Sequence, residues 1–70
     1  MRWCKKDRSG ECGSFLKRLI GRRDVKVQLS EGMLFIDEVM GVVTENGTDF
    51  AVFTHNDRVA VSSIEWVELS

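Results

Sequence analysis

The chain is poor in the residues that build metal sites and that interrupt secondary structure. Its 70 residues include two cysteines, one histidine and no proline. A structural zinc site needs four ligands, commonly cysteine or histidine, and Cys4, Cys12 and the distant His55 fall short of that number. No apolar run reaches the roughly 18 residues of a transmembrane helix. We therefore expect a domain without a bound metal and without a membrane span.

The two cysteines also bear on the cellular compartment. Cys4 and Cys12 can form at most one disulfide. The charged N-terminus is not followed by the apolar segment of a signal peptide, which predicts a cytoplasmic protein. Disulfides are rare in that reducing compartment. Two free thiols are therefore expected in preference to a bridge.

Sequence motifs of enzymes are missing as well. The chain has no glycine-rich phosphate loop, no metal-spaced cluster and no nucleophile motif. Asp37 and Glu38 are adjacent, so on a strand they face opposite sides and cannot act as a carboxylate pair. We expect them to be solvated or to form a bulge, and we expect His55 to be a polar turn residue without a partner. These features predict a protein that is not an enzyme, with no catalytic residue and no cofactor.

The charge, which is −1 overall, is distributed unevenly along the chain. Residues 1–26 hold nine Lys and Arg against three Asp and Glu, and residues 27–70 hold one Arg against eight acids. The first part therefore carries +6 and the second −7. A basic arm on an acidic body can bind a polyanion, or it can bind the acidic face of a neighbouring copy in an oligomer.

The N-terminal residues predict a tail followed by a helix. Residues 1–13 are polar and basic and show no periodicity, so we expect a flexible basic tail. Ser14 is a good helix N-cap, and Gly21 is a suitable residue just beyond the C-terminus. Between them, one apolar helix face is formed by Phe15, Leu16, Leu19 and Ile20. Two turns are unstable alone, so this helix must pack on the rest of the chain.

The remaining residues predict short strands. Residues 25–29 alternate strictly between apolar and other side chains, and residues 33–44 form a long strand bent at Gly41, with Asp37-Glu38 as a bulge or small break. Asn46-Gly47 is typical of a type I′ hairpin turn. Strands at 49–54, 58–61 and 65–69 follow, with a tight turn at 55–57 and a 3₁₀ turn at 62–64. The predicted fold is mainly β: a short N-terminal helix and a five-stranded, strongly bent antiparallel barrel, forming a single domain over residues 14–70.

This order of elements resembles the Sm-like fold, and in particular the bacterial Hfq-type RNA chaperones. The resemblance is carried by residues 15–20 for the helix, 25–32 for the first strand and turn, 49–53 for the third strand and 59–67 for the closing pair. A generic SH3-like barrel has much of the same pattern. Where Hfq-type proteins have Tyr-Lys-His, this chain has Ala60-Val61-Ser62. The resemblance implies a homo-oligomer, with a ring as one form, in which Phe50 matches an aromatic residue that stacks a base and Asp49 replaces its glutamine neighbour.

Two functions stay open. The basic residues Lys17, Arg18, Arg22 and Arg23 lie within seven positions and, together with Phe50, are the candidate nucleic-acid-binding residues. On this interpretation the chain is a small oligomeric Sm-like module that associates with RNA or DNA. The alternative, favoured by the acidic body, is a protein–protein interaction or structural module with no nucleic-acid role.

Overall fold

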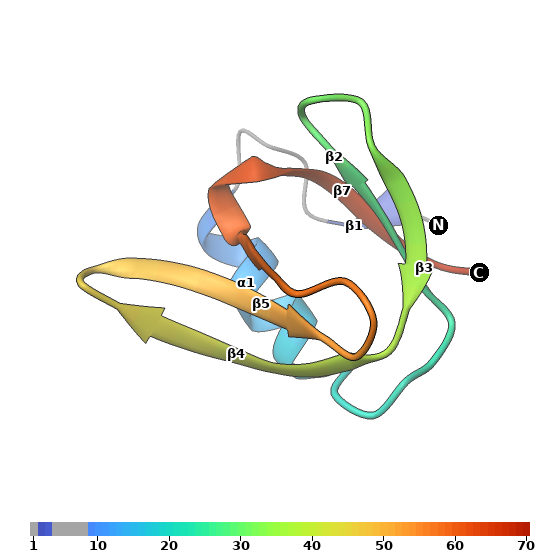
Figure 1. Ribbon diagram of the computed structural model, residues 1–70, viewed down its shortest axis with the longest axis horizontal. Helices are drawn as coiled ribbons and strands as arrows, with labels where there is room; N and C mark the ends of the chain where they lie inside the picture. The colour runs from blue at the N-terminus through green and yellow to red at the C-terminus, as the bar shows by residue number, and fades with distance from the viewer. Residues whose placement is uncertain (1, 4–8) are drawn as a thin grey trace.

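The computed structural model describes residues 2–3 and 9–70, and in this part of the chain it is mainly β (Figure 1). One short α-helix lies near the N-terminus, which confirms the predicted class. The elements in chain order are β1 (Arg2–Trp3), α1 (Ser9–Lys17), β2 (Val25–Leu29), β3 (Leu34–Asp37), β4 (Val39–Glu45), β5 (Thr48–Phe53), β6 (Arg58–Ala60), the 3₁₀ turn η2 (Val61–Ser63) and β7 (Ile64–Leu69).

The strands form two antiparallel sheets. One has the order β1-β7-β2-β3, and the other has the order β4-β5-β6. The closed five-stranded barrel that the sequence predicted is not seen among the described residues. The physical reason lies at Glu38, where the expected long strand breaks into β3 and β4 and the chain crosses from one sheet to the other. A register shift between Val39 and Gly41 adds a further irregularity just beyond the break.

The helix begins earlier than predicted, at Ser9 rather than Ser14, and ends at Lys17. Its buried face is formed by Cys12 and Leu16, which lie one turn apart and are fully buried. Beyond Lys17 the helix ends in a tighter turn, in which the N–H of Leu19 donates to the carbonyl of Leu16, three residues earlier, at 3.0 Å. Ile20, which was expected on the apolar face, is 51% exposed. Residues 1 and 4–8 of the predicted tail lie outside the described residues.

A single core lies between the two sheets and the helix. Alternate residues of β2 are buried, and β7 buries Ile64 and Val67. The helix α1, which contacts β4, β5 and η2, completes the core (Figure 1). The buried apolar residues of this core are Cys12, Leu16, Leu19, Val25, Val27, Leu29, Val39, Ala51, Phe53, Val61, Ile64 and Val67. Because both sheets and the helix contribute, no element can bury its apolar face without the others.

The β4–β5 hairpin has the predicted turn. Asn46 and Gly47 both have positive φ, 52° and 78°, as a type I′ turn requires. The strands pair directly beyond the turn, with Glu45 opposite Thr48. None of the described helices is long and apolar enough to cross a membrane.

Cys12 is disulfide-bonded in the structure, which corrects the expectation of a free thiol at this position. That expectation was based on the assumed compartment and not on geometry. The only other cysteine of the sequence, Cys4, lies outside the described residues.

We expect Cys12 to resist alkylation when the protein is unfolded in denaturant without reductant, because a disulfide sulfur offers no thiolate. Reduction should then make Cys12 reactive and lower the free energy of unfolding by about 2–4 kcal/mol. Peptide mass mapping after alkylation and denaturant titrations with and without reductant measure both effects. Alkylation of Cys12 without reductant would mean that the bridge is absent from the purified protein.

Candidate functional site

The site is organised by Asp37, the last residue of β3, whose side chain is buried with only 3% of the residue exposed. Its Oδ1 accepts hydrogen bonds from the N–H of Glu38 at 2.7 Å and from Nδ1 of His55 at 3.1 Å. Its Oδ2 accepts bonds from the N–H groups of His55 and Asn56, both at 2.9 Å, and from Nδ2 of Asn56 at 2.7 Å. Five donors therefore converge on one carboxylate.

These hydrogen bonds keep Asp37 ionised. Burial by itself would raise the pKa of this carboxyl, but the bonds from Asn56, Glu38 and His55 outweigh burial and hold the pKa far below its ordinary value. An ionised carboxylate only accepts hydrogen bonds, so Nδ1 of His55 is assigned as the protonated nitrogen. The His55 ring is otherwise 82% exposed, which leaves Nε2 toward solvent.

The Asp37 interactions place the β5–β6 turn against the end of β3. Next to them, the N–H of Thr54 donates to the carbonyl of Glu38 at 3.1 Å, and the N–H of Phe53 donates to the carbonyl of Asp57 at 3.3 Å. The turn leads directly into β6. Asp37 therefore sets the position of β6 relative to β3, although these strands belong to different sheets.

A groove of about 380 Å³ lies between β3 and β6. Both strands are at the edge of their sheets. The floor is apolar, and the edge-to-face contact between Phe35 and Phe53, with ring centroids 5.0 Å apart, anchors it to the core. The lining residues are Leu29, Glu31, Met33, Phe35, Asn56, Asp57, Arg58, Val59 and Ser63.

The rim of the groove carries excess negative charge. Glu31 and Asp57 are exposed and form no ion pair within the described part of the chain. Arg58 is the one cation of the lining, and its guanidinium is held by Glu45 at 2.8 and 3.0 Å. This pairing lowers the pKa of Glu45 and raises that of Arg58. The charge of Arg58 is thus balanced mainly by Glu45, which does not line the groove, and to a smaller extent by Asp57, which does.

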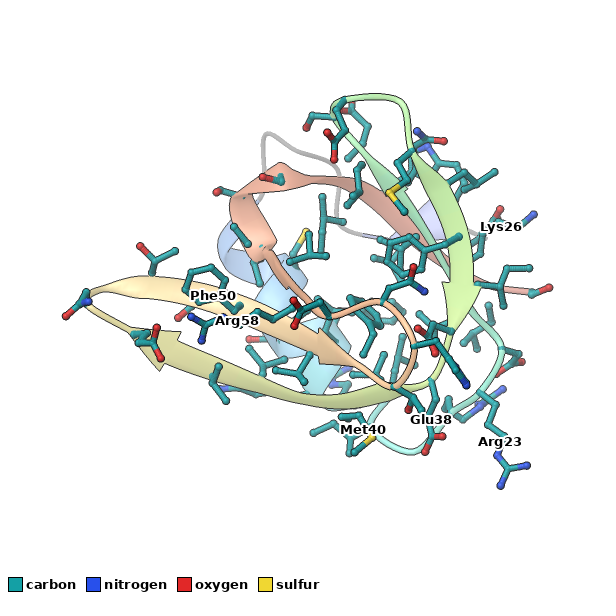
Figure 2. All side chains as sticks on the ribbon, in the orientation of Figure 1. Arg23, Lys26, Glu38, Met40, Phe50 and Arg58 are labelled. Atoms are coloured by element: carbon teal, nitrogen blue, oxygen red, sulfur yellow. The ribbon has the colours of Figure 1, made fainter. Side chains whose placement is uncertain are left out.

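Arg58 also occupies the face of the predicted base-stacking residue. Its guanidinium carbon lies 4.6 Å from the centroid of the Phe50 ring, and the two side chains lie side by side in Figure 2. Phe50 is half-buried on β5. A base that stacked on this face of Phe50 would have to displace a cation that is also ion-paired.

The predicted basic residues lie elsewhere. Lys17 is the last residue of α1 and Arg18 follows it, both exposed. Arg22 pairs with Asp24 at 3.2 Å, and this pairing lowers the pKa of Asp24. Arg23 lies beside a second hollow, of about 310 Å³, lined by Arg23, Ile36, Asp37, Glu38 and His55. Arg23 and Phe50 are on opposite sides of the molecule (Figure 2), so the structure does not bring the five candidate residues together.

The sequence pattern did not point to the residues that build the groove. The small break expected at Asp37-Glu38 is present, but Asp37 is buried and not solvated, and the turn residue His55 has a partner, Asp37. The partners of Asp37 are 18 and 19 positions away. One sequence signal could have indicated this buried site: an acidic residue at the end of an apolar run, followed further along the chain by a His-Asn turn. Among the described residues no cluster of three or more His, Cys, Asp or Glu could hold a metal ion.

The Asp37→Asn substitution tests the role of this carboxylate. An amide places an N–H donor among groups that already donate, so we expect a loss of about 2–3 kcal/mol in the free energy of unfolding. Asp49→Asn is the control, because Asp49 is exposed and bonds only to Thr44, at 2.6 Å, in the described structure. Denaturant unfolding of both variants at neutral pH measures the difference. Equal losses in the two variants would contradict the role assigned to Asp37.

The lowered pKa of Asp37 also predicts a dependence on pH. Because this pKa is lower in the folded than in the unfolded chain, the carboxylate contributes its full stability above the ordinary value of 3.8. The contribution is lost as the pH falls below that value. We expect the free energy of unfolding to decrease steeply below a pH of about 4, and less steeply in Asp37→Asn. Denaturant titrations between neutral and strongly acidic pH test this, and parallel curves for the two proteins would contradict it.

No protein-family model, curated protein or solved structure matches this chain. The assignment of a function therefore rests on three features of its own structure. These are the apolar groove between two strand edges, the unpaired carboxylates of Glu31 and Asp57 on its rim, and the exposed basic residues near the end of α1.

Proposed function

We propose that this chain is a small, non-enzymatic interaction module that binds a partner protein in the groove between β3 and β6. The groove itself carries the proposal, because it combines an apolar floor with a charged rim and lies between two strand edges. Protein interfaces commonly pair an apolar centre with a polar rim. Strand edges offer backbone groups to a partner. The residue that lines the groove and is both apolar and well exposed is Met33.

At the level of the fold, we propose a relation to the Sm-like and SH3-like barrels. If β3 and β4 are counted as one bent strand, the order becomes β7, β2, β3 with β4, β5 and β6, which is five strands beside the short β1. A 3₁₀ turn also precedes the last strand. This supports an opened barrel of that kind. Such folds carry many functions, so the relation does not by itself favour one partner over another.

Association with RNA or DNA is the second candidate. Lys17, Arg18 and Arg23 are exposed and form no ion pair in the described part of the chain, which favours contact with phosphates. The pairing of Arg22 with Asp24, and the position of Arg58 over Phe50, weigh against a larger nucleic-acid site. A homo-oligomer formed through free strand edges would use β3, β6 or the part of β4 beyond Val39, since β1 lies along β7 and Val39 is bridged to Ile20.

A pair of matched variants tests the proposed function. Met33→Lys with Asp57→Lys changes the groove, and Met40→Lys with Glu65→Lys likewise replaces one methionine and one acidic residue by lysine, at exposed positions outside it. We expect the groove variant to lose capture of specific proteins at least about fivefold, as loss of an interface hot spot does, while the control retains it. Quantitative mass spectrometry of captured proteins measures this, and light scattering reports whether either variant changes the mass in solution.

Nucleic-acid binding is measured on the same proteins with labelled RNA and DNA 20-mers at two salt concentrations. On our proposal, binding is weak and is not changed by Arg18→Glu with Arg23→Glu. Tight, strongly salt-dependent binding that this double variant abolishes would replace the protein-partner proposal with the nucleic-acid one.

A further inference from the structure

We infer that the groove takes an extended segment that adds as a strand to β6 and carries an apolar residue flanked, two positions away on each side, by basic residues. The inference rests on the proposed function and specifies the chemistry of its partner. It follows from the free edge of β6, from the direction of its side chains, and from the position of the two rim carboxylates.

The backbone of β6 is paired along one of its two sides in the described structure. Arg58, Val59 and Ala60 pair with β5 on one side, through the residue pairs Val52–Arg58, Ala51–Val59 and Phe50–Ala60. No described strand pairs with β6 on its other side. An extended chain laid along this side can form main-chain hydrogen bonds of the usual antiparallel or parallel kind. Recognition through the backbone explains how so short a strand could contribute to binding.

The side chains of β6 alternate between the two faces of its sheet. Val59 lies opposite the buried Ala51 and packs against the core, so it faces the inner side of the sheet. Arg58 faces the other side, where it reaches Phe50 and Glu45. A residue paired beside Val59 would therefore point to the groove floor, and its two sequence neighbours would point away. The floor is apolar, so the residue beside Val59 should be apolar.

The two carboxylates of the rim lie at opposite ends of the groove. Asp57 directly precedes β6, at one end of the groove. Glu31 lies at the other end, because the adjacent Ser30 donates from N and Oγ to the carbonyl of Ser63 at 2.8 and 3.1 Å, and Ser63 ends the turn that follows β6. Residues two positions before and after the apolar one lie on the same face, about 7 Å away along the strand. Lysine or arginine there would meet the two carboxylates.

The charge pattern excludes other occupants of the groove. Two unpaired carboxylates repel a phosphorylated or acidic segment and the backbone of a nucleic acid. Arg58 offsets them only in part: its guanidinium is held by Glu45, and of the two rim carboxylates only Asp57 interacts with it electrostatically. A basic, alternating segment is thus the class of partner that fits.

The test is an NMR titration of the full ¹⁵N-labelled chain with each of four capped peptides. The probe peptide has Lys-Thr-Val-Thr-Lys at its centre. The second peptide replaces both lysines by glutamate, the third moves the lysines next to the valine, and the fourth carries an N-methyl group on the valine backbone. We expect the probe alone to give saturable shifts at the amides of residues 57–60. Glu31→Gln and Asp57→Asn should each weaken its binding about two- to fivefold, while Glu65→Gln should not.

Equal binding of the glutamate peptide, of the reordered peptide or of the N-methylated peptide would overturn the inference, and so would shifts confined to residues outside the groove. Absence of binding by any peptide would also overturn it. If no peptide binds but the double variant Met33→Lys with Asp57→Lys still loses capture of a protein, the proposed function stands and only the extended basic segment is rejected. If capture is also unaffected by the groove variant, both fail.

Discussion

The arrangement of this small protein depends on one buried carboxylate. Removing a charge from water is costly unless it is well hydrogen-bonded, and Asp37 meets that condition through five donors from three residues. These donors come from the crossover at Glu38 and from the β5–β6 turn. The carboxylate therefore joins the end of one sheet to the edge of the other. No buried side-chain nitrogen or oxygen in the described part of the chain lacks a partner.

The crossover between the sheets creates both the core and the candidate interface. Because the chain leaves the first sheet at β3 and enters the second at β4, the edge strands β3 and β6 lie on either side of a groove. Exposed strand edges invite pairing with other chains, and proteins usually protect them. Here β1 lies along β7, and β6 is short. The groove is thus the place where an unprotected edge, an apolar floor and excess negative charge coincide.

Ion pairs formed in the folded protein decide which of the charged residues in the sequence remain available to a partner. Arg22 looked like part of a basic cluster, but it is paired with Asp24. Arg58, the single cation of the acidic half, is paired with Glu45 and covers Phe50. Surface pairs of this kind contribute little stability. Their effect on function is larger, because they decide which charges remain available to a partner: Glu31 and Asp57 at the groove, and Lys17, Arg18 and Arg23 away from it.

The sequence by itself determined the features that depend on neighbouring residues. Strict alternation predicted β2, Asn46-Gly47 predicted the hairpin turn, and the short-strand pattern predicted the mainly β class, since each of these reflects local backbone preference or the period of a half-buried strand. Only the tertiary structure decided the start of α1, because the helix, with the buried Cys12 in it, packs on β4, β5 and η2 far along the chain. The sequence left a bulge or a small break open at Asp37-Glu38, and the tertiary structure decided that the chain crosses between sheets there. It also decided the groove, because the partners of Asp37 lie 18 and 19 positions away and the groove needs the edges of two sheets. Contacts of that range follow from packing, which local patterns do not encode.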